Sequence, residues 1–165
     1  MKPPAVPLDY IRQLTPIYQM TIPTAFRDAN DHMNMRYYLH IFDDAGDVLV
    51  AQFGLTAAYH AEHHSGGFDL EHHLHYLKEV RIGDQVTIYP RLVARSAKRI
   101  HYLLFMVNET QETLASIFEC VNSFADLTMR RTAPYPPAIA AQIDTILLPH
   151  QQLTWPAPIC GVMSA

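Results

Sequence analysis

The strongest constraint on the fold is an amphipathic segment that runs from Met35 to Gly54. Its apolar residues recur every three or four positions, which places them on one face of an α-helix, and its acidic residues fall on the other face. Gly54 is typical of the residue that follows a helix C-terminus. The pattern predicts one helix of about 18 residues, longer than the usual roughly 11–12. The positions expected to be buried are Met35, Tyr38, Leu39, Phe42, Ala45, Leu49 and Phe53.

Segments of strand character lie on both sides of this helix. Tyr18–Thr24 precedes it, alternates apolar and polar residues, and has Pro23 at an edge or at its end. Thr56–Gly67 follows it and reads as a short helical turn and a loop. Arg99–Asn108 is apolar on both faces, so it should be a central strand covered on both sides. The four strands expected after the helix are Phe68–Val80, Val86–Arg95, Arg99–Asn108 and Leu114–Asp126.

This order of elements predicts an α+β fold in which an antiparallel five-stranded sheet wraps one long central helix. We expect a single domain over residues 1–165, with a core at about 18–128 and a C-terminal tail, 129–165. The tail should contain a short helix, Pro137–Leu147. Such a sheet leaves exposed edges, which are commonly covered by oligomerisation.

Composition narrows the function classes. Hydrophobic residues make up 49% of the chain and charged residues 17%, as in globular proteins, and the net charge of −4 gives no basic surface for nucleic acid. Only two cysteines, Cys120 and Cys160, are present, which fits a reducing compartment. The first ten residues hold no signal-peptide run, and no stretch approaches the roughly 20 apolar residues of a membrane span. We therefore expect a cytoplasmic protein with no membrane or nucleic-acid partner.

A polar cluster stands directly before the predicted helix. Asp28, Asn30, His32 and Asn34 are spaced two apart, so an extended segment would project all four to one side. A helix N-terminus has unpaired N–H groups and favours negative charge. A carboxylate, an imidazole and such a helix end are the parts of an acyl-transfer or hydrolysis site.

The motif Asp28-x-Asn30-x-His32-x-Asn34, followed by Tyr37 and Tyr38, resembles the hotdog thioesterases. The likeness is to the 4-hydroxybenzoyl-CoA thioesterase-like and betainyl-CoA thioesterase-like branches. The resemblance extends over about Tyr18–Asp126. Within this range a second, weaker motif runs from Leu74 to a Gly83-Asp84 turn. The sequence departs from the family pattern at Asp31, where many relatives have glycine. The resemblance implies a hotdog fold and hydrolysis of a small-molecule acyl-CoA thioester to free acid and CoA. It also implies no cofactor beyond the coenzyme A of the substrate, and a homodimer or homotetramer.

The resemblance makes Asp28 the chemical residue, either as nucleophile on the thioester carbonyl or as general base for water. The alternative for Asp28 is an ordinary helix N-cap acid. Asn30 would orient a carboxylate or the substrate, or be a turn residue. His32 would act as a base or as a donor to the thioester oxygen, or be a buried histidine bonded to the backbone. Asn34 best fits the helix N-cap, at the edge of the substrate site.

The remaining candidates are substrate-binding residues. Backbone N–H groups around Met35 and Tyr37 would hold the oxyanion. Glu71, His73 and Glu79 are predicted on one strand face. Because hotdog sites form between subunits, one of these three would complete the site from a second chain, although a solvated or structural role fits each of them. A basic group would hold the CoA phosphates or be a solvated turn; it comprises Arg95, Lys98 and Arg99.

More than half of the ten histidines lie between His60 and His75, and their spacing permits a metal site. No cysteine joins them in the sequence and the resembled family needs no metal, so we expect none. Two other functions remain open. One is a non-catalytic acyl-CoA binding module, and the other is a hotdog hydratase or dehydratase, whose usual Gly/Pro-rich lead into the helix is missing here.

Overall fold

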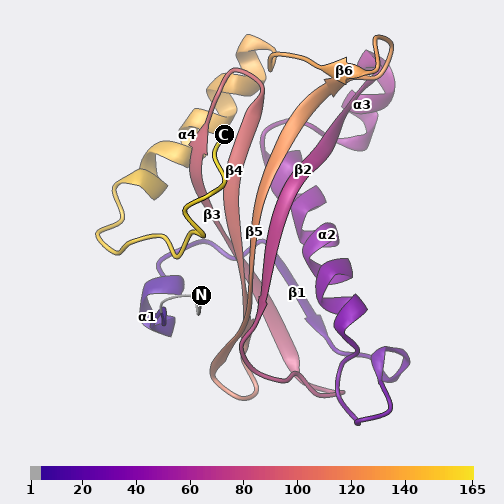
Figure 1. Ribbon diagram of the computed structural model, residues 1–165, viewed down its shortest axis with the longest axis vertical. Helices are drawn as coiled ribbons and strands as arrows, with labels where there is room; N and C mark the ends of the chain where they lie inside the picture. The colour runs from indigo at the N-terminus through magenta and orange to yellow at the C-terminus, as the bar shows by residue number, and fades with distance from the viewer. Residues whose placement is uncertain (1–4) are drawn as a thin grey trace. The chain divides into compact units, whose positions relative to one another are not determined.

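The computed structural model describes residues 5–165 (Figure 1). Residues 1–4, part of the segment in which we expect no signal peptide, lie outside this range. The helices are α1 (Leu8–Ile11), the 3-10 turn η1 (Thr24–Phe26), α2 (Met35–Gln52), α3 (Ala57–His63) and α4 (Pro137–Gln151). The strands are β1 (Tyr18–Thr21), β2 (Ser65–Tyr76), β3 (Gln85–Arg95), β4 (Arg99–Asn108), β5 (Thr113–Asp126) and β6 (Arg131–Thr132).

The sheet has the strand order β1-β3-β4-β5-β2, and the two-residue strand β6 pairs with the end of β5. The class is α+β, as predicted, with five main strands. Helix α2 is the longest helix of the described range, but α4, with 15 residues, is longer than the short tail helix that we predicted. β4 is the central strand and is buried along nearly its whole length, which confirms the expectation from its apolar residues on both faces. β6 is the one strand that the sequence analysis missed in the described range 5–165, and it is too short to show a pattern.

The chain forms two compact units. The first comprises the chain up to Val48, Leu74–Pro90 and Leu104–Phe118, and the second comprises Leu49–His73, Arg91–Leu103 and Glu119–Ala165. In the first unit, the Phe42 ring of α2 stacks on the Phe118 ring of β5 with centroids 5.3 Å apart. In the second, the Gly54 backbone lies near the Ile139 side chain of α4. The single-domain organisation stays a prediction.

Helix α2 has 18 residues and ends before Gly54, whose φ of 91° only glycine adopts readily. Its length and its C-terminal stop confirm the prediction. The predicted buried stripe is wrong at two positions, because Met35 and Leu39 are exposed and Ile41 is fully buried instead. A stripe inferred at a 3.6-residue period locates the centre of a buried face better than its margins.

The strand expected at Phe68–Val80 lies earlier in the chain. β2 begins at Ser65, so the predicted loop Ser65–Gly67 belongs to the strand, and it ends at Tyr76. The Gly67 backbone lies close to the Asn122 side chain of β5, an approach that a residue without a Cβ permits. Alternation in the sequence predicts an apolar face for this strand that includes Phe68 and Leu70, but both side chains are exposed.

Two prolines illustrate how the fold accommodates a missing N–H. Pro90 lies in β3 beyond the residues Gln85–Ile88 that pair with β1, so it interrupts no bond of that ladder. Pro149 lies inside α4, which continues to Gln151 instead of ending at Leu147 as predicted. The Leu92 N–H donates to His150 Nδ1 at 3.0 Å, and this tertiary contact fixes the added turn.

Within the described residues, none of the helices combines the length and the apolar character that spanning a membrane demands.

Candidate active site

The polar motif folds as a tight hairpin rather than as an extended segment. Arg27 and Met33 form an antiparallel bridge, and the Asp28 N–H donates to the His32 carbonyl oxygen at 2.9 Å. Asp31 closes the turn with a φ of 66°, a left-handed conformation that aspartate tolerates better than most residues. The expectation that four side chains project to one side is therefore wrong, because the chain reverses between Asp28 and Asp31.

The hairpin fixes the Asp28 carboxylate. Its Oδ1 accepts hydrogen bonds from the Asn30 N–H at 2.8 Å and from the His32 N–H at 3.2 Å. Its Oδ2 has no hydrogen bond to the residues that the structure describes, and the side chain is partly buried. Asn30 thus orients the carboxylate through its backbone, whereas its own side chain is exposed. The Asp28 carboxylate therefore has one oxygen fixed by two hydrogen bonds and a second oxygen available to act on a substrate or a water molecule.

His32 pairs with a residue that the sequence placed elsewhere. Its Nε2 lies 2.8 Å from Glu79 Oε2, and the second oxygen of Glu79 accepts from Arg81 Nε at 2.9 Å. Glu79 was predicted on the same strand face as Glu71, but β2 ends at Tyr76 and Glu79 lies in the segment after it. The alternation was extended past the end of the strand, so the pairing of Glu79 with His32 was missed.

Asn34 caps helix α2, as predicted. Its Oδ1 accepts from the Arg36 N–H at 3.1 Å and from Arg36 Nε at 3.2 Å, and its carbonyl oxygen accepts from the Tyr37 N–H at 3.0 Å. These bonds satisfy two of the amides that a helix N-terminus leaves unpaired. The amide of Met35, the first helical residue, is left as the candidate oxyanion donor.

Aromatic rings flank this helix end. The Tyr37 ring lies parallel to the Phe26 ring with centroids 3.8 Å apart, and His40 meets both rings edge-on. Phe26 was not predicted, because a single aromatic residue in a turn gives no signal in the sequence. The Met35 side chain, by contrast, is 67% exposed.

Tyr38 is a second residue that the sequence analysis did not assign to the site. Its hydroxyl is buried and donates to the Lys78 carbonyl oxygen at 3.4 Å. Burial raises the pKa of Tyr38 to about 12, and the nearby charges of Glu79 and Asp28 add to the shift. Tyr38 therefore stays protonated at neutral pH, and its hydroxyl remains a hydrogen-bond donor.

The Gly83-Asp84 turn of the second motif has a structural role. Asp84 is 6% exposed, and its Oδ2 accepts from the Arg81 N–H at 2.9 Å and from Asn108 Nδ2 at 2.7 Å. Asp84 and Arg81 also line a cavity of about 220 Å³, together with the Glu79 that pairs with His32. The other lining residues are Lys78, Gln111 and Thr113.

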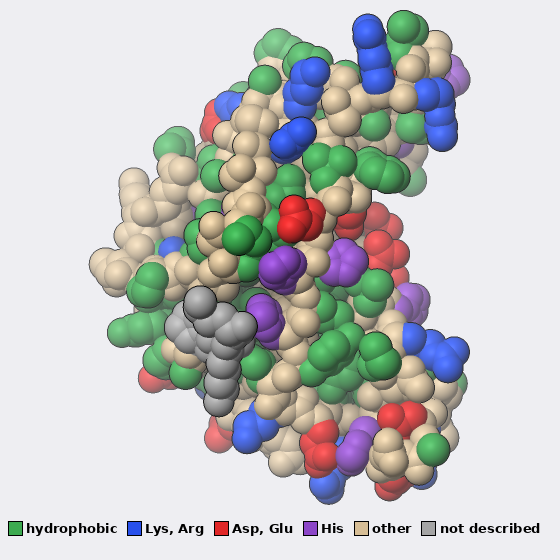
Figure 2. Space-filling model, in the orientation of Figure 1, with side chains coloured by type: hydrophobic (Ala, Val, Ile, Leu, Met, Phe, Trp, Pro, Cys, Tyr) green, Lys and Arg blue, Asp and Glu red, His purple; other side chains and the backbone are tan. Residues whose placement is uncertain are grey.

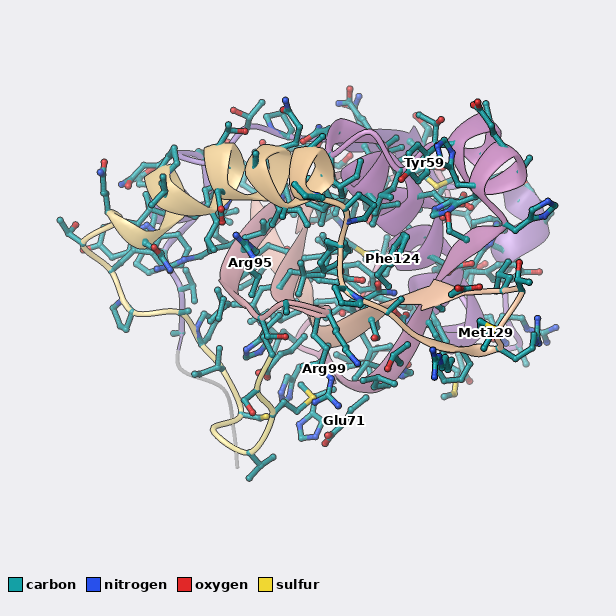
Figure 3. All side chains as sticks on the ribbon, turned by 90° about the horizontal axis from the view of Figure 1, so that it is seen from above. Tyr59, Glu71, Arg95, Arg99, Phe124 and Met129 are labelled. Carbon is teal, nitrogen blue, oxygen red and sulfur yellow. The ribbon has the colours of Figure 1, made fainter. Side chains whose placement is uncertain are left out.

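The other predicted substrate-binding residues belong to the second unit. Arg95 forms an ion pair with Asp144 of α4, beside which it lies in Figure 3. Lys98, in the turn between β3 and β4, and Arg99, the first residue of β4, are exposed. Their backbone N–H groups donate to Ser96 Oγ at 3.4 and 3.2 Å. Besides Glu79, six of the predicted site residues therefore lie in the first unit and five in the second. The five are Glu71, His73, Arg95, Lys98 and Arg99.

The histidine-rich segment does not gather its histidines into one site. His60 Nδ1 lies 3.0 Å from Ser65 Oγ, and the His63 ring stacks on Tyr59. On β2, His73 Nε2 lies 3.8 Å from Glu71 Oε1. Among the described residues, the one group that could hold a metal ion consists of His73, Glu119 and Cys160.

Comparison with known proteins places the chain in a family. The family model of the thioesterase-like superfamily matches residues 22–143. A betainyl-CoA thioesterase of Pseudomonas aeruginosa is 28% identical over 153 residues, which are 92% of this chain and 95% of that protein. An L-carnitine dehydrogenase/betainyl-CoA thioesterase of Agrobacterium fabrum is 35% identical over 117 residues, or 71% of this chain. The match covers 24% of the Agrobacterium protein, so this chain spans about a quarter of its length.

Solved structures give the same assignment. A Staphylococcus aureus protein solved in complex with CoA is 26% identical and superposes with a TM-score of 0.83, over 92% of this chain and 96% of that one. A putative thioesterase of Pseudomonas putida, 23% identical with a TM-score of 0.75 over 92% and 96% of the two chains, shows the same fold. The predicted hotdog fold is thereby confirmed. The chain belongs to the thioesterase-like superfamily.

Proposed function

We propose that the protein is an acyl-CoA thioesterase in which Asp28 performs the chemistry at the mouth of helix α2. The observation that carries this proposal is the Asp28 carboxylate, with Oδ1 held by two backbone N–H groups and Oδ2 available. Membership in the thioesterase-like superfamily and the relatives named as CoA thioesterases support the reaction class.

Two routes fit this carboxylate. As nucleophile, Asp28 Oδ2 attacks the thioester carbonyl, the C–S bond breaks and CoA leaves as a thiolate. Water then cleaves the acyl-aspartate anhydride and supplies the proton that the thiolate takes up. As general base, Asp28 takes a proton from the water that attacks the same carbonyl, the C–S bond breaks, and that proton goes to the leaving thiolate. In both routes the carbonyl oxygen becomes negative, and the Met35 N–H at the positive end of the α2 dipole is the donor proposed to stabilise it.

His32 is proposed to orient the reacting groups. Its contact with Glu79 fixes the imidazole, since a carboxylate that accepts from one ring nitrogen sets the ring plane and the tautomer. Tyr38 adds a protonated hydroxyl to the same region. The proposed site thus combines one chemical carboxylate with groups that act by position.

The substrate is proposed to be a small-molecule thioester of CoA with a short or polar acyl group. The named activity of the Pseudomonas aeruginosa relative is on betainyl-CoA, and the cavity beside Glu79 is lined by charged and polar side chains. Lys98 and Arg99 remain candidates for the CoA phosphates, whereas Arg95 is engaged by Asp144. CoA is the leaving group, so no separate cofactor enters this proposal.

We also propose a homo-oligomer, a dimer or tetramer, in the cytoplasm. β2 is the last strand in the sheet order and exposes Phe68, Leu70 and Tyr76, a combination that promotes pairing with another edge. The predicted substrate contacts of Glu71 and His73 depend on such a neighbouring chain. Light scattering of the purified protein measures its oligomeric state directly.

The test is a panel of acyl-CoA thioesters assayed with a thiol-trapping dye. Release of free thiol from at least one member is expected. Asp28→Asn keeps an oxygen that accepts both backbone N–H groups, so the hairpin should persist while hydrolysis falls by at least about 100-fold. Asp31→Asn is the matched control, because Asp31 is exposed, pairs with Arg27, and has a φ that asparagine also tolerates.

Three outcomes would reject the proposal. Binding of acyl-CoA without thiol release indicates a binding module, and hydration of an enoyl-CoA member indicates a hydratase. Full activity of folded Asp28→Asn removes the assigned chemistry. A single turnover in ¹⁸O-water probes the route. ¹⁸O in the Asp28 carboxylate, from attack of water on the aspartyl carbon of the anhydride, identifies Asp28 as the nucleophile, because the general-base route places ¹⁸O only in the product acid.

A further inference from the structure

Three potential metal ligands from distant parts of the sequence converge in the second unit. They are His73 of β2, Glu119 of β5 and Cys160 of the C-terminal tail, and their ligand atoms all lie within 4.8 Å of one another. β2 and β5 are neighbours in the sheet, which brings the first two together. The tail after α4 adds the cysteine. This is the cysteine that the sequence alone could not associate with a histidine.

Glu119 is the centre of this group and is only 1% exposed. Its Oε1 lies 2.8 Å from His101 Nε2 of β4, and its Oε2 accepts from the Cys160 N–H at 2.7 Å. A buried carboxylate is costly unless charge or hydrogen bonds compensate it. Both oxygens are thus fixed in place, while each keeps a further lone pair for another partner.

The donor set is that of a zinc site. Thiolate, imidazole and carboxylate together favour Zn²⁺, which in open sites takes three protein ligands and a water molecule. We propose that His73, Glu119 and Cys160 bind a Zn²⁺ ion, with water as the fourth ligand. His73 and Cys160 are partly exposed, so water has access to the fourth position.

The geometry is close to what the ion needs. Donor atoms at about 2.0–2.3 Å from a tetrahedral zinc are roughly 3.3–3.8 Å apart, so the three side chains must close by about 1 Å. His73 and Cys160 are able to rotate because neither is fully buried. His101 then holds the coordinating carboxylate from behind, as hydrogen-bond partners of metal ligands commonly do.

Figure 2 shows several histidine side chains gathered beside an acidic side chain on the visible face. Figure 3 shows Glu71 and Arg99 projecting to the same side of the second unit, apart from Arg95, which lies beside α4. The Glu71 carboxylate, 3.8 Å from His73 Nε2, adds negative charge next to the proposed ion. Zinc would also tie the C-terminal tail to the sheet through Cys160.

The test uses the full chain after treatment with a chelator. ZnCl₂ is titrated against a chromogenic chelator, and one equivalent should bind. Cys160→Ser and His73→Gln should each weaken binding by at least about 10-fold. Cobalt gives the specific readout, since a thiolate ligand produces a charge-transfer absorption that Cys160→Ser should abolish. Zinc should raise the thermal midpoint of the unmodified chain and leave that of Cys160→Ser unchanged.

Two matched controls keep the result specific. His72→Gln removes a neighbouring histidine whose side chain lies on the other face of β2. Cys120→Ala removes the other cysteine, whose buried thiol has a raised pKa and is a poor metal ligand. Both should bind zinc like the unmodified chain. The proposal fails if no zinc binds, if the cobalt absorption survives in Cys160→Ser, or if His72→Gln or Cys120→Ala loses zinc binding. In each case His101 and Glu119 form a buried pair without a metal ion.

Discussion

His32 Nε2 lies 2.8 Å from Glu79 Oε2, and the same carboxylate accepts a hydrogen bond from Arg81. One side chain from the segment after β2 thereby holds a residue of the hairpin that precedes α2. The backbone strengthens this link, because the Met33 N–H donates to the Val80 carbonyl oxygen at 2.8 Å. The position of the imidazole is thus set by residues far from it in the sequence.

Glu79→Gln and His32→Gln should each lower kcat/KM for the best thioester by about tenfold if they act through one interaction. The double variant should then lose little more than either single variant, since the second substitution removes nothing that is still present. A double-mutant cycle on kcat/KM measures this coupling. If the double variant loses kcat/KM by the product of the two single-variant factors, the two residues act independently.

Asn34→Ala should destabilise the protein by about 1 kcal/mol, because the Arg36 N–H loses its cap. Asn34→Ser keeps a side-chain oxygen that can accept the same hydrogen bond, so this variant should lose only a fraction of that stability. Urea unfolding of the three proteins measures the difference. Equal stability of Asn34→Ala and the unmodified chain would contradict the capping role.

His150 should make stability depend on pH in the acid range. Burial, together with the nearby charge of Arg91, lowers the pKa of His150 from 6.5 to about 4, so its ring is neutral and accepts from the Leu92 N–H. Between pH 6.5 and 4 the unfolded chain binds the extra proton, so stability is complete above pH 6.5 and falls as the pH drops.

The free energy of unfolding should fall by about 1–3 kcal/mol between pH 6.5 and 4. His150→Asn removes the titrating group and retains an acceptor, so its stability curve should be flatter between pH 6.5 and 4. Denaturant unfolding at several pH values compares the two proteins. An unchanged acid slope in the variant would show that other groups cause the loss.

Gly54 and Gly83 form a matched pair for backbone strain, with φ values of 91° and 88°. Gly83→Ala should cost about 1–2 kcal/mol, because its new Cβ meets nothing within 4 Å and only the conformation is strained. Gly54→Ala should cost more, since its Cβ would lie 3.2 Å from Ile139 Cδ1. Thermal unfolding ranks the two, and the opposite order would contradict this account.

Periodic features were predictable from the sequence because they repeat a local rule. The 18-residue helix α2 and the central strand β4 follow from the pattern of apolar residues. The start of β2 was not predictable, because Ser65-Gly66-Gly67 has the composition of a loop and becomes a strand only beside β5. Likewise α4 extends past Pro149 because His150 contacts β3.

The sequence by itself determined which residues could carry chemistry, since Asp28, His32 and the Asn34 cap stand at the start of the one long amphipathic helix. Only the tertiary structure decided how they are held. The Asp31 turn points Asp28 Oδ1 at two backbone amides, and Glu79 reaches His32 from another segment. Cys160 meets Glu119 for the same reason. Such contacts depend on where the chain returns in space, and no local pattern of residues encodes that return.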